Sequence, residues 1–369
     1  MMKNLFISNL NEKSHDKFTT DTGLLLRRKL DKSFKSLCKI FTKANLIFLD
    51  NGRGLSDEEY FNKLDRNYID PQSYDIKKNK NNIIVERYPA LKDKEPYIFV
   101  CNHTCPEDIE TVLNVIDRNA YLILGSIESL KYNPEMYLSF LNGMIPFDIL
   151  DKEQRKGLML KMQRVVKTNS ILIFPEGSHN YSPNNLINPI YDGPVNLALK
   201  SGRKIVLVTM LKDKNISYVD VSNPIDIREV KLDSHYNIDM CNQKSYVNTL
   251  SLYIRDKMAS AAYLIMERHI ARAHRTDALE ENLRMAKIKD AFTKLKWKKD
   301  VFEAEYLTKK TELDRVNEEV LNTVNSLIHK PHSLEPESKR YWLRKQIALD
   351  NKDVVIRMRR YLEENNTRA

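Results

Sequence analysis

The chain has 369 residues, enough for two or three folding units with sizeable cores, and this length excludes a peptide or a small disulfide-stapled domain. Its 60 lysines and arginines outnumber its 50 aspartates and glutamates and give a net charge of +10. Such a basic balance favours anionic partners, which include lipid surfaces, phosphorylated substrates and nucleic acids.

The cysteine content and the hydropathy predict a cytoplasmic protein. The longest nearly apolar run, 258–266, is about half as long as the ~18 residues that a membrane-spanning helix requires. Residues 1–12 lack the compact apolar stretch of a signal peptide. The cysteines are too few and too scattered for a secreted disulfide framework. They are Cys38, Cys101, Cys105 and Cys241.

Residues 24–48 are predicted to form an amphipathic helix, because apolar and basic side chains separate onto opposite faces at ~100° per residue. The apolar face collects Leu26, Leu30, Phe34, Leu37, Cys38, Phe41, Ala44 and Phe48. The opposite face collects Arg28, Lys32, Lys35, Lys39 and Lys43. This distribution suits docking on an anionic membrane surface without crossing it, but also a surface helix that packs on the core.

The middle of the chain alternates short apolar runs with polar, helix-like stretches, as in an α/β sheet. Four runs, each bounded by Gly, Pro or Asn, are predicted to be buried strands. They are 97–101, 120–124, 170–174 and 204–209. The expected fold is a mixed, largely parallel sheet flanked by helices.

The last third of the chain is predicted to be helical. All nine glycines lie at or before Gly202, and no proline falls between Pro224 and Pro331. Its dense charges of both signs indicate solvated helix faces. We divide the chain into an N-terminal segment (1–80), an α/β core (81–226) and a helical C-terminal region (227–369). The polar stretch 71–82 is the linker at the first boundary.

The first chemically informative stretch follows the strand predicted at 97–101. His103 should lie on the loop at the start of a helix, with Asp108 in its first or second turn. Thr104 and Glu107 have the spacing of a capping box, and Pro106 suits a first helical turn. This layout can bring the carboxylate of Asp108 to one imidazole nitrogen, leaving the other nitrogen to take a proton from a hydroxyl. A helix-capping or core histidine has the same spacing.

The second stretch follows the strand predicted at 170–174, which runs directly into Pro175, Glu176 and Gly177. Glycine lets the backbone approach a ligand closely, and a following nest of amides can accept an anion or a carbonyl oxygen. Glu176 could instead be a buried structural acid bonded to neighbouring amides.

Together these stretches resemble the PlsC-like family of glycerol-phosphate and lysophosphatidate acyltransferases. The family's His-x4-Asp motif is matched by His103 and Asp108, and its Phe-Pro-Glu-Gly motif by 174–177, in the expected order. Asn102, the middle landmark 143–147 and the stretch 192–202 look like further family landmarks.

The resemblance, which covers roughly 90–225, implies transfer of a fatty acyl group from coenzyme A or acyl carrier protein to a glycerolipid hydroxyl, with lysophosphatidate as the leading acceptor. His103 would act as the base and Asp108 would orient it, without an acyl-enzyme. The resemblance also implies binding residues for the substrate at both motifs: Asn102, Glu176, Gly177, Ser178 and His179. A competing route, acylation of a Cys105 thiolate beside His103, is disfavoured because Cys105 stands where the family often has Ser.

Two positions depart from the family pattern. Ile149 and His179 stand where arginines are common in the family. The planar guanidinium group of arginine suits phosphate, so the loss of two of them weakens the case for a phosphate-bearing acceptor. Other basic residues are candidates to replace them: Lys152, Arg155, Lys156 and Arg203.

Two other functions remain open: the same chemistry on a sugar or glycolipid hydroxyl, and a non-catalytic, membrane-associated scaffold. Nucleic-acid binding is not expected, because basic residues are interspersed with acids. No metal is expected either, since Cys101, His103 and Cys105 do not complete a four-ligand set. We therefore expect no cofactor beyond the acyl carrier, and a peripheral location on the cytoplasmic face of the membrane.

Overall fold

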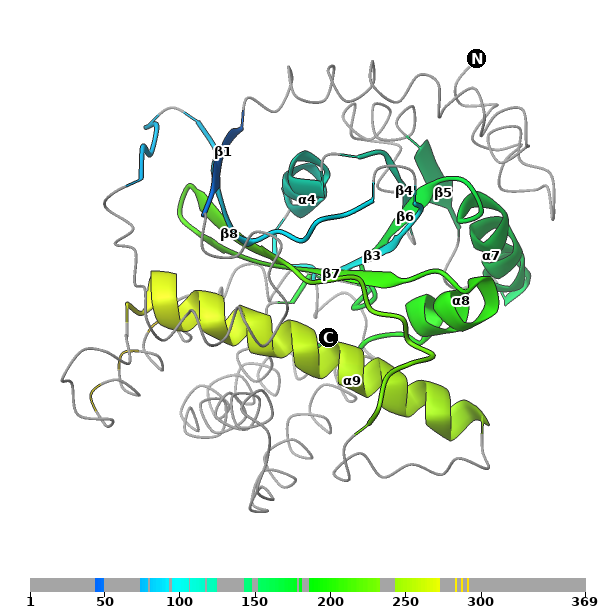
Figure 1. Ribbon diagram of the computed structural model, residues 1–369. Coiled ribbons are helices and arrows are strands. Elements are labelled where there is room, and N and C mark those ends of the chain that lie inside the picture. Colours follow the sequence, from blue (N-terminus) through cyan, green and yellow to red (C-terminus); the bar gives the residue numbers. More distant parts are fainter. Residues whose placement is uncertain are drawn as a thin grey trace, which may run out of the picture.

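The computed structural model describes most of the chain between residues 44 and 272 (Figure 1). The described residues are 44–49, 74–92 except 79, 95–124 except 106 and 117, 143–147, 152–232 except 178 and 181–185, and 243–272, with the single helical positions 283, 287 and 291.

The described chain is built on one eight-stranded mixed sheet, in the order β1-β2-β8-β7-β3-β6-β4-β5. Every neighbouring pair is parallel except β7 and β8, which are antiparallel. The strands are β1 (Asn45–Phe48), β2 (Asn82–Arg87), β3 (Ile98–Cys101), β4 (Ala120–Leu124), β5 (Met144–Pro146), β6 (Ser170–Ile173), β7 (Ile205–Asp213) and β8 (Ile216–Val221). This arrangement confirms the predicted fold class.

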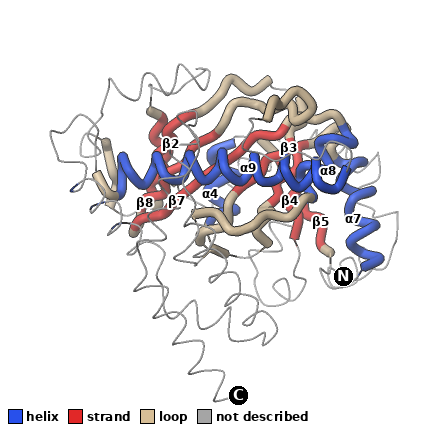
Figure 2. Tube along the Cα trace, turned by 90° about the horizontal axis from the view of Figure 1, so that it is seen from below, coloured by secondary structure: helices blue, strands red, loops and turns tan. Residues whose placement is uncertain are grey.

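Helices cover both faces of the sheet. Helix α4 covers one face of the sheet. Helices α8 and α9 cover the opposite face, and α7 lies near the β5 edge (Figure 1). Seen from below, α9 runs across the strands (Figure 2). The helices are α4 (Asp108–Ile116), α7 (Lys152–Val165), α8 (Gly193–Ser201), α9 (Gln243–Ile265) and a π-helical turn, η3 (Met266–Ile270). Each face of the sheet contributes to its own buried apolar cluster, because strand side chains alternate between the two faces.

The four predicted strands are all present, and the bounds of three of them agree with the prediction to within one residue. The strand at 120–124 coincides with β4, while β3 and β6 each lose one terminal residue of the prediction. The strand predicted at 204–209 extends to Asp213, because β7 continues past β3 and turns at Lys214, which has a positive φ of 56°, into β8. Apolar runs alone did not reveal β1, β2, β5 and β8, which are short or mix apolar with polar residues.

The helix prediction for 24–48 is wrong at its end. Asn45–Phe48 forms β1, which pairs in parallel with β2, and the ring of Phe48 packs edge-on against Tyr88 at 5.7 Å. Pairing with the edge of β2 satisfies backbone groups that a helix would have bonded internally. Residues 24–43 lie outside the described residues.

The predicted linker at 71–82 contains an ordered turn next to β2. The Asn82 side chain accepts from the Lys77 N–H at 3.0 Å and from Asn45 Nδ2 at 2.9 Å. It donates to the carbonyls of Lys77 and Lys80, both at 3.1 Å. Its amide thus ties the turn to β1 and β2.

The predicted helical C-terminal region is helical over 243–270, whereas its described residues 227–232 form turns and irregular chain. The helix α9 packs on β7 and β8 and passes directly into η3. Both β1 and α9 therefore belong to the sheet's own unit, although they lie outside the predicted core of 81–226. Among the described residues no helix is both long and apolar enough to cross a membrane.

Two buried ion pairs hold the β2 side of the sheet. Arg87 donates to Asp220 through two hydrogen bonds, Nε to Oδ1 at 3.0 Å and Nη2 to Oδ2 at 2.8 Å. The neighbouring carboxylate of Glu86 binds Arg268 and His269 of η3. Burial, and then the charge of Arg268, lowers the pKa of His269 to about 3, so its neutral ring donates Nε2–H to Glu86. These contacts fasten the π-helical turn to the sheet.

Replacing Asp220 with alanine should lower the free energy of unfolding by about 3 kcal/mol, because a buried guanidinium loses both carboxylate acceptors. Denaturant titration of purified protein measures this change. The control is Asp226→Ala, which removes the carboxylate from a second Arg–Asp pair, Arg228 with Asp226, whose arginine is exposed. Its effect should be much smaller, and equal losses in both variants would contradict the assigned role of burial.

Candidate active site

Asn102 continues strand β3 through its side chain. Its Nδ2 donates to the Met210 carbonyl at 2.9 Å, and its Oδ1 accepts from the Met210 N–H at 2.8 Å. Asn102 is fully buried, and its side chain carries the strand ladder one step past Cys101. With its amide bonded to β7, Asn102 positions the following residue, His103, and its contact with substrate stays a prediction.

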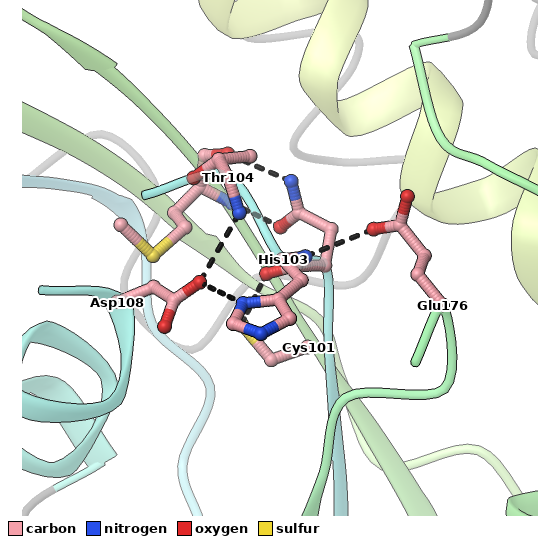
Figure 3. Close-up of polar contacts among 7 residues, drawn as sticks. Cys101, His103, Thr104, Asp108 and Glu176 are labelled. Atoms are coloured by element: carbon pink, nitrogen blue, oxygen red, sulfur yellow. Dashed lines mark hydrogen bonds and ion pairs between the residues drawn. The ribbon is translucent and has the colours of Figure 1, made fainter. Parts of the chain in front are cut away.

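His103 and Asp108 meet as the motif spacing predicted. The Nδ1 of His103 lies 2.5 Å from Oδ2 of Asp108, which also accepts from the Thr104 N–H at 3.1 Å (Figure 3). Asp108 is the first residue of α4 and is fully buried, whereas 19% of the His103 side chain is exposed. A buried carboxylate on one ring nitrogen leaves the opposite nitrogen as the group able to accept a proton.

The predicted capping box is wrong by one residue. The carboxylate of Glu107 pairs with Lys212 Nζ at 3.0 Å, and Asp108 instead reaches back to the Thr104 N–H. The hydroxyl of Thr104 has no hydrogen-bond partner among the residues described. One oxygen of Asp108 therefore holds both the loop before α4, at Thr104, and the ring of His103. Pro106 lies outside the described residues.

Glu176 supports the backbone of His103 from the side opposite Asp108 (Figure 3). Its Oε1 accepts from the His103 N–H at 2.9 Å and its Oε2 from the Asn188 N–H at 2.7 Å. The side chain is buried, so Glu176 has the geometry of a structural acid bonded to neighbouring amides. The Asn180 N–H donates to the His103 carbonyl at 2.7 Å. One segment, 176–180, therefore holds both backbone polar groups of His103.

Gly177 is required by the turn that presents Glu176. Its φ is +74°, and a Cβ at this position would lie 2.7 Å from Cε2 of Tyr191. Tyr191 lies over the turn with 61% of its surface exposed, and its N–H donates to the Pro175 carbonyl at 2.9 Å. Ser178, also predicted to bind substrate, lies outside the described residues.

Two rings flank the imidazole of His103. The ring of His179 has its centroid 3.8 Å from that of His103 at an interplanar angle of 39°, and the ring of Phe174 lies at 4.9 Å and 41°. His179 was predicted as a substrate contact, and the structure places it against the base. Sequence reasoning assigned no role to Phe174 or Asn180, although both lie in the same motif stretch.

His103, Asp108 and His179 could hold a metal ion by proximity, since each offers one ligand atom within 4.8 Å of the others. The hydrogen bond between His103 and Asp108 already uses one nitrogen and one carboxylate oxygen. Tetrahedral zinc sites take four ligands at about 2.0–2.3 Å. The three residues therefore suit proton transfer better than metal binding, and the absence of a metal stays a prediction.

The cysteines beside the site are poor nucleophiles. Burial, with the nearby charge of Asp108, raises the pKa of the Cys105 thiol to about 11. The same two causes raise the pKa of Cys101 well above its ordinary value. Both thiols are buried and remain protonated near neutral pH, which argues against the covalent route through Cys105.

Of the basic residues proposed to replace the family arginines, the structure places Arg203 away from His103. Arg203 precedes β7 at the sheet edge opposite His103, where its Nη2 donates to the Lys167 carbonyl at 3.0 Å. Arg155 is exposed on α7. Ile149 and the side chains of Lys152 and Lys156 lie outside what the structure describes.

Residues 81–211 match the family model described as Acyltransferase. A crystal structure of the 1-acyl-sn-glycerophosphate (LPA) acyltransferase PlsC from Thermotoga maritima is similar at 14% identity and a TM-score of 0.35, over 70% of this chain and 86% of that chain. A likeness at this level carries no functional argument. No curated protein matches the sequence. The family match covers both motifs, so residues 81–211 form an acyltransferase domain, as the motifs predicted.

Acyl transfer should depend on the His103–Asp108 pair. His103→Ala and Asp108→Asn should each lower kcat by a factor of about 10²–10⁴, because one loses the base and the other loses the charge that orients it. Initial rates of thiol release measure the effect, and circular dichroism checks the fold.

The matched control is Glu107→Gln, the same kind of change one residue away, on a carboxylate that pairs with Lys212. It should retain most of the activity. A fully active His103→Ala variant would reject the catalytic assignment.

Proposed function

We propose that this acyltransferase moves a fatty acyl group from a thioester of coenzyme A or acyl carrier protein to a glycerolipid hydroxyl, with lysophosphatidate as the leading acceptor. The observation that carries the proposal is the 2.5 Å contact between His103 Nδ1 and the buried Asp108 carboxylate, on a histidine that keeps part of its side chain exposed.

In this mechanism His103 is the general base. Asp108 holds the tautomer with the proton on Nδ1, so the lone pair on Nε2 can take the proton of the acceptor hydroxyl. The acceptor oxygen attacks the thioester carbonyl carbon and forms the new C–O bond. The positive charge that develops on the imidazole is stabilised by the Asp108 carboxylate.

The tetrahedral intermediate then collapses. Its C–S bond breaks, the carbonyl re-forms, and the sulfur leaves with the proton returned by the imidazolium, as a free thiol. The products are an ester and the thiol of the carrier, and His103 is again neutral. No acyl-enzyme is required, in keeping with the raised pKa of the Cys105 thiol.

A hydroxyl without a phosphate, on a sugar or glycolipid, is the second candidate acceptor. It is favoured by the placement of His179, which stacks on the base where the family commonly has a phosphate-binding arginine. Lysophosphatidate is favoured by the family motifs and by the basic charge of the chain.

The proposed setting is the cytoplasmic face of an anionic membrane, reached from the cytoplasm. A lipid acceptor and a basic chain with amphipathic character in 24–43 support this location. The proposed reaction needs no cofactor other than the acyl carrier.

Donor and acceptor are tested together with purified protein. Free thiol should be released from acyl-CoA or acyl carrier protein only when a lysolipid is present, and kcat/KM should be highest for lysophosphatidate. Higher kcat/KM for sugar or uncharged lipid acceptors would favour the second candidate. Equal thiol release without any acceptor would indicate a thioesterase and would contradict the proposal.

Membrane docking is tested by vesicle flotation. The protein should float with vesicles containing anionic lipid and not with neutral ones, and reversing the charges of Lys32, Lys35 and Lys39 should reduce this binding. Reversal of Lys161, Arg164 and Lys167 on the α7 side is the matched control. Flotation indifferent to reversal of the first set would exclude its role.

A further inference from the structure

His179 presents a second titratable ring to the base. The two imidazole centroids are 3.8 Å apart, in van der Waals contact, and both side chains are partly exposed. We propose that His179 is a positioning residue that holds the ring of His103 by stacking and lowers the proton affinity of the base when it is itself protonated.

The backbone fixes this contact. The Asn180 N–H, next to His179, donates to the carbonyl of His103 itself at 2.7 Å. The Asn180 side chain is buried and donates to the Leu186 carbonyl at 3.0 Å. The backbones of His103 and of the 179–180 segment are thus tied together beside their rings, and the two segments cannot separate without loss of this hydrogen bond.

Ring stacking restricts the base from a direction that Asp108 does not control. A single hydrogen bond at Nδ1 leaves the imidazole able to rotate about that bond. Phe174 and His179 contact the ring and limit this rotation, which keeps Nε2 aimed at one place. An aligned base is worth more than a mobile one, because small misplacements of reacting groups cost rate.

The charge of His179 also acts on the base. While His179 is neutral, its ring can lie against the imidazolium that forms on His103 during acyl transfer without electrostatic repulsion. Once His179 is protonated, the two imidazolium rings repel each other. Protonated His179 must therefore make His103 harder to protonate and a weaker base. This consequence rests on the proposed role of His103 in acyl transfer.

Other titratable groups face the pair from the elements around it. Asp108 of α4 and Glu176 of the adjacent turn are hydrogen-bonded acids. The thiols of Cys101 and Cys105 have pKa values raised by burial and carry no charge near neutral pH.

Three substitutions separate stacking from charge. His179→Phe keeps an aromatic ring that never protonates, so His103 should take up its proton more readily and the acid limb of the kcat profile should move to higher pH by about one unit. His179→Arg keeps a planar group with permanent charge, so the limb should move to lower pH while the plateau rate falls. His179→Ala removes the stack, and its plateau kcat should fall about tenfold.

Leu160→Arg is the control for net charge. Leu160 is 63% exposed on α7, so the variant adds the same charge away from the base and its pH profile should follow that of the unmodified protein. The proposal would be overturned if the acid limbs of the kcat profiles coincided in the unmodified protein, His179→Phe and His179→Arg. A raised acceptor KM in His179→Phe with unchanged kcat and pH profile would also overturn it and would make His179 an acceptor contact.

Imidazole NMR titration of the same proteins tests the ring coupling without any substrate. The His103 signal should titrate at higher pH in His179→Phe than in the unmodified protein, and at lower pH in His179→Arg. Identical His103 titration curves in all three proteins would contradict the coupling between the two rings. Shifted titrations in a protein that transfers no acyl group would leave the coupling standing and reject the proposed function.

Discussion

His103 is held at three points before any substrate arrives, and the rest of the site depends on this restraint. Its N–H donates to Glu176, its carbonyl accepts from Asn180, and its ring donates to Asp108. Two of these contacts come from one short segment that follows β6, and the third comes from the first residue of α4. Bringing the segment after β6 to this residue requires β3 and β6 to be neighbours in the sheet, and they are.

This arrangement changes what the Phe-Pro-Glu-Gly stretch does. Its acid accepts two backbone N–H groups, and its glycine adopts a positive φ under the ring of Tyr191. Both features shape the turn and fix the base. Preorganisation of this kind places the cost of ordering the site in the folded protein, so it need not be met when substrate binds.

Much of the site could be predicted because it depends on local sequence. The approach of Asp108 to His103 follows from a loop and one helical turn, and the strands before both motifs are apolar runs with clear boundaries. The stack of His179 on His103 depends on the pairing of β3 with β6, which single-residue patterns do not encode. The strand at Asn45–Phe48 was mistaken for helix because its apolar residues also fit a helical period, and only the free edge of β2 decides between the two.

Strand β7 belongs to both halves of the sheet. Its first part pairs with β3, its second part pairs with β8, and Val208 takes part in both ladders. The backbone of Met210, in the second part, bonds to Asn102 beside the base. Because side chains alternate along a strand, one residue inserted between Val208 and Met210 would turn every later side chain to the wrong face. Changes of chain length are therefore tolerable at the Lys214–Asn215 hairpin turn and not within this strand, which matters for any insertion made when the enzyme is re-engineered.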